Sequence, residues 1–407
     1  MSNTQKKNLP ELRFPGFEGE WEEKKLGNLT TKIGSGKTPK GGSENYTNKG
    51  IPFLRSQNIR NGKLNLNDLV YISKDIDDEM KNSRTYYGDV LLNITGASIG
   101  RTAINSIVET HANLNQHVCI IRLKKEYYYN FFGQYLLSRK GKRKIFLAQS
   151  GGSREGLNFK EIANLKIFTP TIFEEQQKIG QFFSKLDQQI ELEEQKLELL
   201  QQQKKGYMQK IFSQELRFKD ENSEDYPHWE SSKIEKYLKE RNERSDKGQM
   251  LSVTINSGII KFSELDRKDN SSKDKSNYKV VRKNDIAYNS MRMWQGASGK
   301  SNYNGIVSPA YTVLYPTQNT SSLFIGYKFK THRMIHKFKI NSQGLTSDTW
   351  NLKYKQLKNI NIDIPVLEEQ EKIGDFFKKM DILISKQKMK IEILEKEKQS
   401  FLQKMFL

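Results

Sequence analysis

The sequence of 407 residues contains one cysteine and no long apolar run. A single thiol, Cys119, excludes an intrachain disulfide framework and a cysteine-rich zinc site. No stretch approaches the roughly eighteen consecutive apolar residues that a membrane-spanning helix needs. The first residues, SNTQKKNLPELRF, also lack the apolar run of a signal peptide. We therefore expect a soluble, cytoplasmic protein with no membrane partner.

A balance between positive and negative charge is also missing. The formal net charge is +20, from 68 Lys and Arg against 48 Asp and Glu. Acidic and basic residues nearly cancel in two stretches, 173–213 and 367–407, so the excess positive charge lies in the remaining segments. A basic surface of this size favours contact with a polyanion such as nucleic acid. A basic surface that is merely solvated is the alternative.

Motifs that carry catalysis are scarce. The phrase GSGKT at Gly34–Thr38 resembles a phosphate-binding loop, but the position that needs a further glycine is Thr31. No glycine-rich dinucleotide or methyl-donor loop follows a strand, and no two prolines are adjacent, so the Pro-Pro motif of amino-group methyltransferases is missing. His111 and His117 are spaced wrongly for two metal ligands on one helical face. We expect no catalytic residue, no metal site and no cofactor bound by this chain.

The most informative feature is a stretch that occurs twice. Phe173–Ser213 returns without a gap as Leu367–Leu407, and both copies predict a long helix of roughly 60 Å at 1.5 Å per residue. Apolar residues recur at steps of three, four and seven, which is typical of coiled coils, so each helix offers the other a partner. A long helix docked on its own domain is the alternative. The predicted seam of the helix pair consists of Ile179, Phe183, Leu186, Ile190, Leu197, Leu200, Ile211, Ile373, Phe377, Met380, Ile384, Ile391, Leu394 and Met405.

The segments outside the helices are also similar to each other. The phrase ELRFPGFEGEW at Glu11–Trp21 has an echo at Glu215–Glu230, directly after the first repeat, which places the N-terminal arm near the end of the second helix. We divide the chain into an N-terminal arm, a first recognition domain, a first helix region, a second recognition domain and a second helix region, with bounds 1–20, 21–170, 171–214, 215–365 and 366–407.

Strand and helix signals repeat in the same order within the two globular segments. The first segment predicts one helix over Glu126–Ala148 and strands at Ile51–Leu54, Asp89–Thr95, His117–Leu123 and Leu165–Phe168. The second segment predicts equivalent strands at Asn284–Ser290 and Ala310–Pro316 and an equivalent basic helical stretch at Phe324–Ile340. The fold class is therefore α+β, with two similar mixed α/β domains.

Several phrases make the whole chain, from about Glu11 to Leu407, similar to the specificity subunits of Type I restriction-modification enzymes. These phrases are the EEQxKIG start of each repeat helix, the KKGYMQKIF and KQSFLQKMF ends, the ELRF lead-ins, GDVLLNITGASIG, LNQHV and MRMWQGA. The resemblance implies two target-recognition domains separated by an antiparallel helix pair with pseudo-two-fold symmetry. It also implies a non-catalytic subunit that reads one half of a split double-stranded DNA sequence with each domain.

The same resemblance implies partners. Two modification subunits would dock on the helices, carry S-adenosylmethionine and methylate an adenine in each half-site, while the helix length sets the unread spacer. A restriction subunit, which translocates and cuts DNA, would join them.

Candidate DNA-contacting residues are polar or aromatic side chains in loops beside strand ends, because Arg can pair with guanine and Asn or Gln with adenine at base edges. In the first domain they are Lys37, Thr38, Arg55, Gln57, Asn58, Arg60, Arg101, Asn115, Gln116 and Arg154. In the second domain they are Asn256, Arg282, Asn289, Arg292, Trp294, Gln295, Ser347 and Trp350.

Two other classes of protein remain open at this stage. A coiled-coil adaptor that joins partners without reading DNA would show neither sequence-specific protection of DNA nor strong dependence of binding on salt. An enzyme that modifies nucleic acid alone would need a methyl-donor loop or a cluster of metal-binding carboxylates. Sequencing of methylated adenines after co-expression with a modification subunit separates the three classes.

Overall fold

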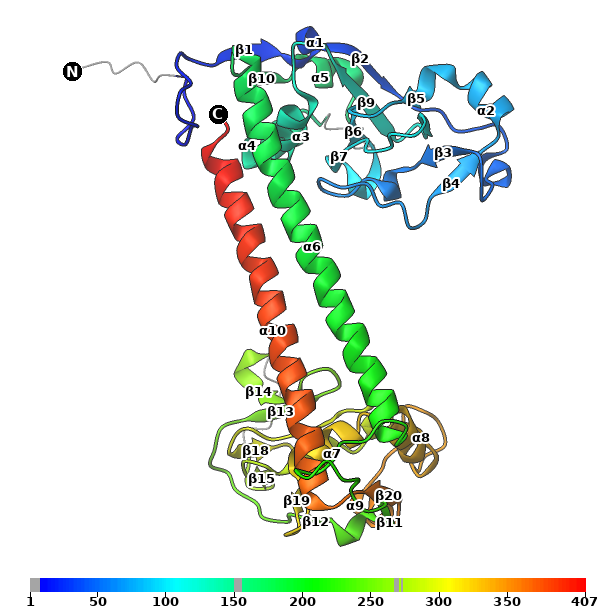
Figure 1. Ribbon diagram of the computed structural model, residues 1–407, viewed down its shortest axis with the longest axis vertical. Helices are drawn as coiled ribbons and strands as arrows, with labels where there is room; N and C mark the ends of the chain where they lie inside the picture. Colours follow the sequence, from blue (N-terminus) through cyan, green and yellow to red (C-terminus); the bar gives the residue numbers. More distant parts are fainter. Residues whose placement is uncertain (1–7, 150–155, 267–270, 272–273) are drawn as a thin grey trace, which may run out of the picture. The chain divides into compact units, whose positions relative to one another are not determined.

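The computed structural model describes residues 8–149, 156–266, 271 and 274–407. The chain divides into two compact units (Figure 1): unit 1 comprises Met1–Glu194 and Met389–Leu407, and unit 2 comprises Gln195–Lys388. In the parts of the chain described, no helix has both the length and the apolar character needed to cross a membrane.

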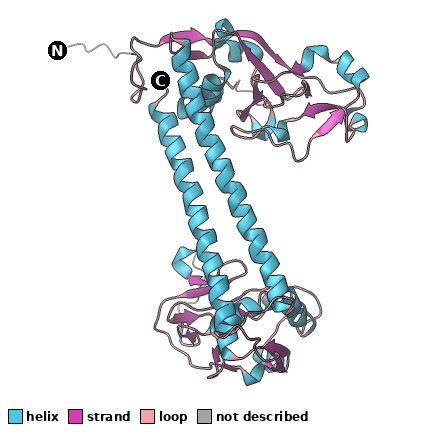
Figure 2. Cartoon of the chain, in the orientation of Figure 1, coloured by secondary structure: helices cyan, strands magenta, loops and turns pink. Residues whose placement is uncertain are grey.

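Two long helices run through both units. Helix α6 spans Phe173–Phe212 and α10 spans Leu367–Lys404, and each is one uninterrupted helix (Figure 2). Acidic residues in the first turn and a lysine in the last turn of each helix complement the helix dipole. Each unit therefore contains part of α6 and part of α10. Within each unit the two parts are antiparallel, as the contacts below show.

The remaining elements of unit 1 alternate strands with short helices. In chain order they are β1 (Glu22–Lys25), α1 (Leu26–Leu29), β2 (Thr30–Ser35), β3 (Ile51–Leu54), β4 (Val70–Ile72), α2 (Lys74–Glu79), β5 (Arg84–Thr85), β6 (Val90–Asn93), β7 (Thr102–Ile104), β8 (Ala112–Leu114), β9 (Val118–Leu123), α3 (Tyr129–Leu137), α4 (Arg139–Leu147), α5 (Phe159–Asn164) and β10 (Lys166–Thr169).

Unit 2 follows a similar order. Its elements are β11 (Glu230–Lys233), β12 (Leu238–Glu240), β13 (Leu251–Thr254), β14 (Gly258–Lys261), β15 (Lys279–Val281), β16 (Ile286–Asn289), β17 (Ser298–Lys300), β18 (Gly305–Val307), β19 (Tyr311–Pro316), α7 (Ser322–Lys328), α8 (His332–Ile340), α9 (Tyr354–Leu357) and β20 (Asn361–Ile364).

The two units share one sheet topology. Unit 1 has a four-stranded antiparallel sheet in the order β2-β9-β6-β7, and unit 2 has one in the order β12-β19-β16-β17. Each unit also pairs its first strand with its last, β1 with β10 and β11 with β20. The central strands are buried along their length: all four residues of β6 and the first three residues of β16 are buried, and Asn289 at the end of β16 is half-buried. The sequence prediction of two similar mixed α/β domains is confirmed.

The second layer of strands differs between the units. Unit 1 has a mixed sheet in the order β4-β3-β8-β5, in which β3 and β8 are parallel. Unit 2 has two separate antiparallel pairs, β13 with β14 and β15 with β18. The loops that this layer supports are therefore built differently, while the sheet next to the long helices is kept.

The single helix predicted over Glu126–Ala148 is wrong, because two helices occupy this stretch. Helix α3 ends at Leu137, and the extended residue Ser138 caps α4 by accepting a hydrogen bond from the Gly141 N–H. A Cβ at Gly141 would lie 2.1 Å from the Tyr135 carbonyl oxygen, so only glycine permits this turn. The basic stretch of unit 2 is divided in the same way, with Thr331 as the cap of α8.

Aromatic pairs join the two long helices at matched positions. In unit 1 the rings of Phe183 and Phe406 stack with centroids 5.7 Å apart, and Phe182 packs edge-on against Phe401. In unit 2 the rings of Phe212 and Phe377 stack at 5.8 Å, and Tyr207 packs edge-on against Phe376. Offset stacked and edge-on rings stabilise such contacts beyond their apolar burial. Each unit thus fixes the register of its own part of the helix pair.

Ion pairs in the seam repeat in the same way. Lys398 of α10 binds Asp187 of α6 in unit 1, and Lys204 of α6 binds Asp381 of α10 in unit 2. A third group reaches each carboxylate from the globular part of the unit: the Gln134 amide donates to Asp187 at 2.7 Å, and the Tyr327 hydroxyl donates to Asp381 at 2.6 Å. Polar groups at a seam specify register at a cost in stability.

The predicted seam residues differ in burial. Half-buried members are Leu186, Leu197, Leu200 and Ile384, and buried members are Ile179, Phe183, Ile190, Ile211, Ile373, Phe377, Met380, Ile391, Leu394 and Met405. The prediction omitted Phe212, Leu402 and Phe406, which are also buried. Their burial comes from packing against the globular parts, which helical periodicity does not reveal.

The ELRF lead-in of each unit binds a buried glutamate at the start of a long helix. The Arg13 guanidinium donates two hydrogen bonds of 2.7 and 2.8 Å to Glu175, and the Trp21 indole N–H donates to the same carboxylate at 3.3 Å. Arg217 and Trp229 bind Glu369 in the same manner. Hydrogen bonding to Glu175 and Glu369 raises the pKa of both arginines.

The N-terminal arm lies at the end of α10, as the repeated lead-in predicted. The Leu12 N–H donates to the Lys404 carbonyl oxygen at 3.0 Å. At the matching place in unit 2, the Leu216 N–H donates to the Lys210 carbonyl oxygen at 3.1 Å. The N-terminal arm therefore contacts the end of α10 in the way that the segment after α6 contacts the end of α6. The segment after α6 is covalently continuous with its helix, whereas the arm is not continuous with α10.

Tyr135 in the core of unit 1 and Lys328 in the core of unit 2 occupy equivalent positions but differ in chemistry. Gln176 accepts the Tyr128 N–H and Gln370 accepts the Ser321 N–H, so α3 and α7 begin alike. Seven residues further on, unit 1 has the buried Tyr135 and unit 2 has Lys328. The lysine is 2% exposed, and its ammonium group lies 4.7 Å from the centre of the Trp229 ring.

Burial lowers the pKa of Lys328 from 10.5 to about 8; nearby Asp363 opposes this shift, and Arg333 and Lys337 add to it. The unfolded chain therefore keeps a proton between pH 8 and pH 10.5 that the folded chain releases. The contribution of Lys328 to the free energy of unfolding therefore rises with pH across that window. Below pH 8 the buried charge lowers the free energy of unfolding by its full amount. A shift of this size corresponds to about 3 kcal/mol, which the cation–π contact with Trp229 offsets in part.

Replacement of this lysine gives a test. Lys328→Met is expected to raise the free energy of unfolding at pH 7, and the gain should shrink as the pH rises from 8 to 10.5. Urea denaturation at four or five pH values measures it. Lys355→Met, at an exposed lysine of the same unit, is the control and should show no such dependence. A gain for Lys328→Met that stays constant with pH would contradict the assigned shift.

Candidate nucleic-acid interface

Four loops of unit 1 are held together by backbone hydrogen bonds. The Lys37 N–H donates to Leu114 at 2.9 Å, which fixes the segment after β2 beside the β8–β9 link. The Asn115 N–H donates to Leu54 at 3.1 Å, which joins that link to the segment after β3. The Ile94 N–H donates at 3.0 Å to the residue before β9 and so adds the β6–β7 loop. Candidate residues far apart in sequence therefore meet at one place.

A hollow of about 440 Å³ opens among three of these loops. Gln57, Arg60 and Arg101, all predicted from the sequence, line it. None of the described residues that line it is acidic; they are Ser56, Gln57, Arg60, Thr95, Gly96, Ala97, Ser98, Arg101 and His117. Two arginines beside hydroxyl, amide and imidazole groups provide donors and acceptors of the kind that pair with base edges and phosphates.

Two polar groups of the hollow, on Thr95 and His117, are absent from the list of DNA-contacting candidates, although base contact or a polar structural role was the expectation for His117. Thr95 Oγ1 and His117 Nδ1 are 2.6 Å apart, so the hydroxyl fixes the ring of a histidine that faces the hollow. Asn93 supports the loop by donating to the Ser56 carbonyl oxygen at 2.9 Å and to Ser98 Oγ at 3.0 Å. The position of His117 next to Asn115 and Gln116 was the available signal.

The loop between β6 and β7 and the loop between β16 and β17 have the same shape at their ends. Gly100 and Gly296 each stand two residues before the returning strand, with φ of 83° and 84°. This left-handed conformation suits glycine. The loops differ in their exposed residues.

In unit 2 the loop between β16 and β17 carries an aromatic pair. The rings of Trp294 and Trp350 pack edge-on with centroids 5.2 Å apart, and both are partly exposed. The Leu352 N–H donates to the Ser290 carbonyl oxygen at 2.8 Å and ties the two segments together. Trp350 also lies under the Lys339 ammonium group at 5.6 Å.

Polar candidates surround this pair. Arg292 and Gln295 lie in the same loop, 3.4 Å apart between Nη1 and Oε1. Asn289 ends β16 and accepts the Met291 N–H through its side chain. Ser347 is exposed in the segment that precedes Trp350. The structure thus places Asn289, Arg292, Trp294 and Gln295 in one loop beside Trp350, while Ser347 lies three residues before Trp350 in the sequence.

Lys330 connects this loop to the β13–β14 turn. Its ammonium group donates to the Ile255 carbonyl oxygen at 2.7 Å and to the Gly296 carbonyl oxygen. The predicted residue Asn256 lies in that turn and is exposed. It borders a larger hollow that is described below.

Some candidates hold the fold together and do not face the loop clusters. Asn58 is fully buried; its Oδ1 accepts the Arg55 N–H and its Nδ2 donates to the Asn65 carbonyl oxygen. Arg282 lies at the opposite end of β16 from the Trp294 loop and makes two hydrogen bonds to Glu243. The prediction for Asn58 is corrected, because a short polar sequence reads the same whether its side chains point in or out. The Arg282 side chain is 57% exposed, so its contact with DNA stays a prediction.

The other candidates of unit 1 differ in exposure. Asn115 is 9% exposed and accepts the His117 N–H. Arg55 donates to the Asp68 carbonyl oxygen at 3.0 Å and stacks on Tyr46. Lys37 and Gln116 are exposed and Thr38 is half-buried. Arg154 lies outside the described residues.

An arginine–aspartate pair anchors the far end of each loop-bearing strand. Arg122 binds Asp89 at 2.7 and 2.8 Å, and Arg241 binds Asp285 at 2.7 and 2.9 Å. These hydrogen bonds raise the pKa of both arginines. The aspartates directly precede β6 and β16, so the ion pairs fix the start of both strands in their sheets.

Across the described residues, no group of three His, Cys, Asp or Glu side chains gathers as a metal site requires.

The duplicated sheet, the long helices and the matched loops define a protein built from two similar units. Residues 18–202 and 209–396 match the Type I restriction modification DNA specificity domain. The chain therefore belongs to the Type I restriction modification DNA specificity family, as the sequence resemblance predicted.

Individual relatives are distant in sequence. The chain is similar to the putative type I restriction enzyme MjaX specificity subunit of Methanocaldococcus jannaschii, with 25% identity over 243 residues, 57% of this chain and 56% of that protein. It is also similar to the type I restriction enzyme EcoBI specificity subunit of Escherichia coli, with 31% identity over 144 residues, 34% of this chain and 30% of that protein. The matched regions thus span about half or less of the length of these relatives.

A solved structure has the same fold along nearly the whole chain. The crystal structure of the Type-I restriction-modification system S subunit from M. genitalium superposes with a TM-score of 0.60 and 15% identity, and covers 98% of this chain and 99% of that one. At this identity the similarity shows the fold alone.

Proposed function

We propose that this chain is the DNA-reading subunit of a Type I restriction-modification enzyme, and that each unit reads one half of a split double-stranded sequence. The observation that carries the proposal is the pair of loop clusters, which rise from equivalent strands in the two units but expose different side chains. A shared scaffold with different exposed groups suits two different half-sites. Lysines and arginines supply salt-dependent affinity for phosphates, and side chains at base edges supply specificity.

We propose further that α6 and α10 set the length of the unread spacer and bind two modification subunits. Apolar side chains exposed on the helices support such binding, because large exposed apolar groups mark interaction surfaces. In unit 1 these are Leu192, Met389 and Ile393, which are 65%, 60% and 50% exposed. In unit 2 they are Leu199, Ile382 and Leu383, which are 54%, 45% and 51% exposed.

The partners would carry the chemistry. We propose that the modification subunits hold S-adenosylmethionine and methylate one adenine in each half-site, and that a restriction subunit joins them to cut DNA. This chain would contribute recognition and no catalytic group. The lack of a methyl-donor loop in its sequence supports that division.

Co-expression with the modification subunit tests the proposal. Sequencing of methylated adenines in the host DNA is expected to give a split motif with a fixed gap. No sequence-specific methylation by the assembled complex would favour the adaptor alternative. Methyl transfer by this chain without a partner would instead identify an enzyme.

Single arginine replacements should separate the two half-sites. Arg101→Ala in unit 1 is expected to relax one half of the methylated motif, and Arg292→Ala in unit 2 the other, each at a cost of about 1–3 kcal/mol for a lost base contact. The relative methylation of every single-base variant of the motif measures both. Lys160→Ala, at an exposed residue of α5, is the control. If both halves changed with either arginine, the assignment of one half-site to each unit would be wrong.

A further inference from the structure

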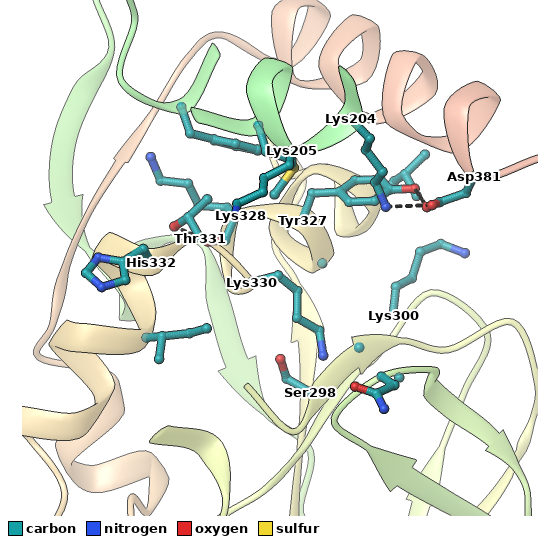
Figure 3. A pocket seen from close by; sticks show the side chains of 18 of the residues that line it. Lys204, Lys205, Ser298, Lys300, Tyr327, Lys328, Lys330, Thr331, His332 and Asp381 are labelled. Carbon is teal, nitrogen blue, oxygen red and sulfur yellow. Dashed lines mark hydrogen bonds and ion pairs between the residues drawn. The ribbon is translucent and has the colours of Figure 1, made fainter. Parts of the chain in front are cut away.

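A hollow in unit 2 has mostly positive side chains among the charged residues that line it. Its volume is about 1150 Å³, and its walls come from the last turns of α6, the β13–β14 turn, β17, α7 and the start of α8 (Figure 3). Among the described residues that line it, Asp381 is the one carboxylate. The lining cations are Lys204, Lys205, Lys300, Lys328, Lys330 and Arg333.

Two of these cations have carboxylate partners. Lys204 binds Asp381, as Figure 3 shows, and Arg333 binds Asp363 at 3.0 Å. For the other four lysines, no ion pair with a described residue is found. Lys300 donates to the Asn302 side chain at 2.8 Å, and Lys330 donates to backbone carbonyl oxygens. Neutral acceptors leave the net positive charge of these groups uncompensated.

Lys328 is the most constrained of the four. The residue is 2% exposed, and its ammonium group lies over the rings of Trp229 and Phe212 but makes no hydrogen bond or ion pair with any residue described. A buried cation without an ion-pair partner is costly, and nearby Asp363 offsets only part of that cost. At the equivalent position unit 1 has a tyrosine, so the fold itself does not require a cation there. Its presence in unit 2 is explained if an anion shares the hollow.

The start of α8 adds backbone donors at the same place. Thr331 caps this nine-residue helix by accepting the Met334 N–H, and Thr331, His332 and Arg333 line the hollow. A helix N-terminus favours a phosphate through its free N–H groups and its dipole. Figure 3 shows Thr331 and His332 on the same side of the hollow as Lys328, with Lys330 and Lys300 further along its wall.

We propose that this hollow is a binding site for a phosphate group, held by Lys328, Lys330 and the N-terminus of α8. The volume exceeds that of inorganic phosphate, and the apolar side chains of Met208, Leu323 and Ile335 line the remaining space. A nucleoside phosphate fits this combination of charge and apolar wall. The backbone of bound DNA is the second source of the same chemical group, and the test distinguishes the two.

The lowered pKa values support a site that responds to an anion. Burial lowers the pKa of both Lys328 and Lys330 to about 8. Both lysines are therefore still mostly protonated at pH 7, and a bound phosphate would stabilise that charge. Binding is expected to weaken as the pH rises above 8.

Calorimetric titration of the full chain, in a buffer without phosphate, tests the proposal. The probes are inorganic phosphate, AMP and a short DNA duplex. We expect inorganic phosphate and AMP to bind to the wild-type chain, and the affinity for AMP to fall at least tenfold in Lys328→Met and in Lys330→Met. Lys355→Met removes an exposed lysine outside the hollow and should bind like the wild type.

The outcomes are distinct. If only the duplex binds and the same two variants weaken it, the phosphate comes from DNA. If no probe binds, or if the variants bind every probe like the wild type, the phosphate site is wrong. Lys328→Met is expected to fold, because it removes a buried charge that has no ion-pair partner among the described residues. It decides the test if Lys330→Met, which also loses hydrogen bonds to two backbone carbonyl oxygens, is less stable. The result is independent of the proposed function, which is judged from the methylated motif alone.

Discussion

Glu175→Gln and Glu369→Gln are each expected to lower the free energy of unfolding by about 3–5 kcal/mol, the range found when one partner of a buried ion pair is removed. Both carboxylates are buried, with side chains 1% and 0% exposed. Each accepts two hydrogen bonds from an arginine and one from a tryptophan. Glutamine keeps the shape but offers one acceptor oxygen, and its amide hydrogens would face the N–H groups of the arginine.

The duplication supplies a matched comparison. Glu175 lies in unit 1 and Glu369 in unit 2, so hydrogen exchange should show each variant loosening mainly its own unit. Glu174→Gln and Glu368→Gln, one residue earlier in each helix and more exposed, serve as controls and should cost less than about 0.5 kcal/mol. Equal losses at the buried and the exposed positions would show that the arginine–glutamate contacts do not anchor the lead-in segments.

Insertion of seven residues after Leu197, matched by seven after Ile391, is expected to change the spacer of the methylated motif and to leave both half-sites unchanged. One heptad preserves the apolar seam because the coiled-coil pattern repeats every seven residues. It lengthens each helix by about 10 Å at 1.5 Å per residue. Since α6 and α10 are uninterrupted through these positions, the added length stays in the helices.

The measurement is again the sequence around methylated adenines. Insertion in α6 alone is the control, because it breaks the match of the seam and should reduce methylation at every site. A complete double insertion with an unchanged spacer would show that the helices do not set it. Altered half-sites would show that they contribute to reading as well as to spacing.

The long helices were predictable because their signal is local and repeated. Periodic apolar residues from Ile179 to Ile211, and again in the second copy, leave little choice of structure. The order of strands was also predictable, since β3, β6, β9 and β10 fall within one or two residues of the predicted ends. The break at Ser138 was missed, because it depends on close packing of Gly141 against the Tyr135 carbonyl oxygen.

The candidate interface was only partly predictable. Arg101 and Arg292 stand out as polar residues after a strand, and they do lie in matched loops. Asn58 has the same kind of sequence context but is buried, since the direction of a side chain in a short loop depends on contacts with distant residues such as Asn65. Lys328 gave no signal, because a lysine in a basic helical stretch reads as a surface residue until its burial against Trp229 is seen.

The contact between Leu12 and Lys404 has a consequence for how the chain is connected. The arm continues after α10 as the chain continues after α6, so the polypeptide is arranged as a closed ring with a single opening. The opening could lie after the first repeat as well as at the present termini. A circularly permuted chain, joined from Leu407 to the arm and opened between Ser213 and Arg217, is expected to keep every helix and strand described here and to exchange the order of the two units along the gene.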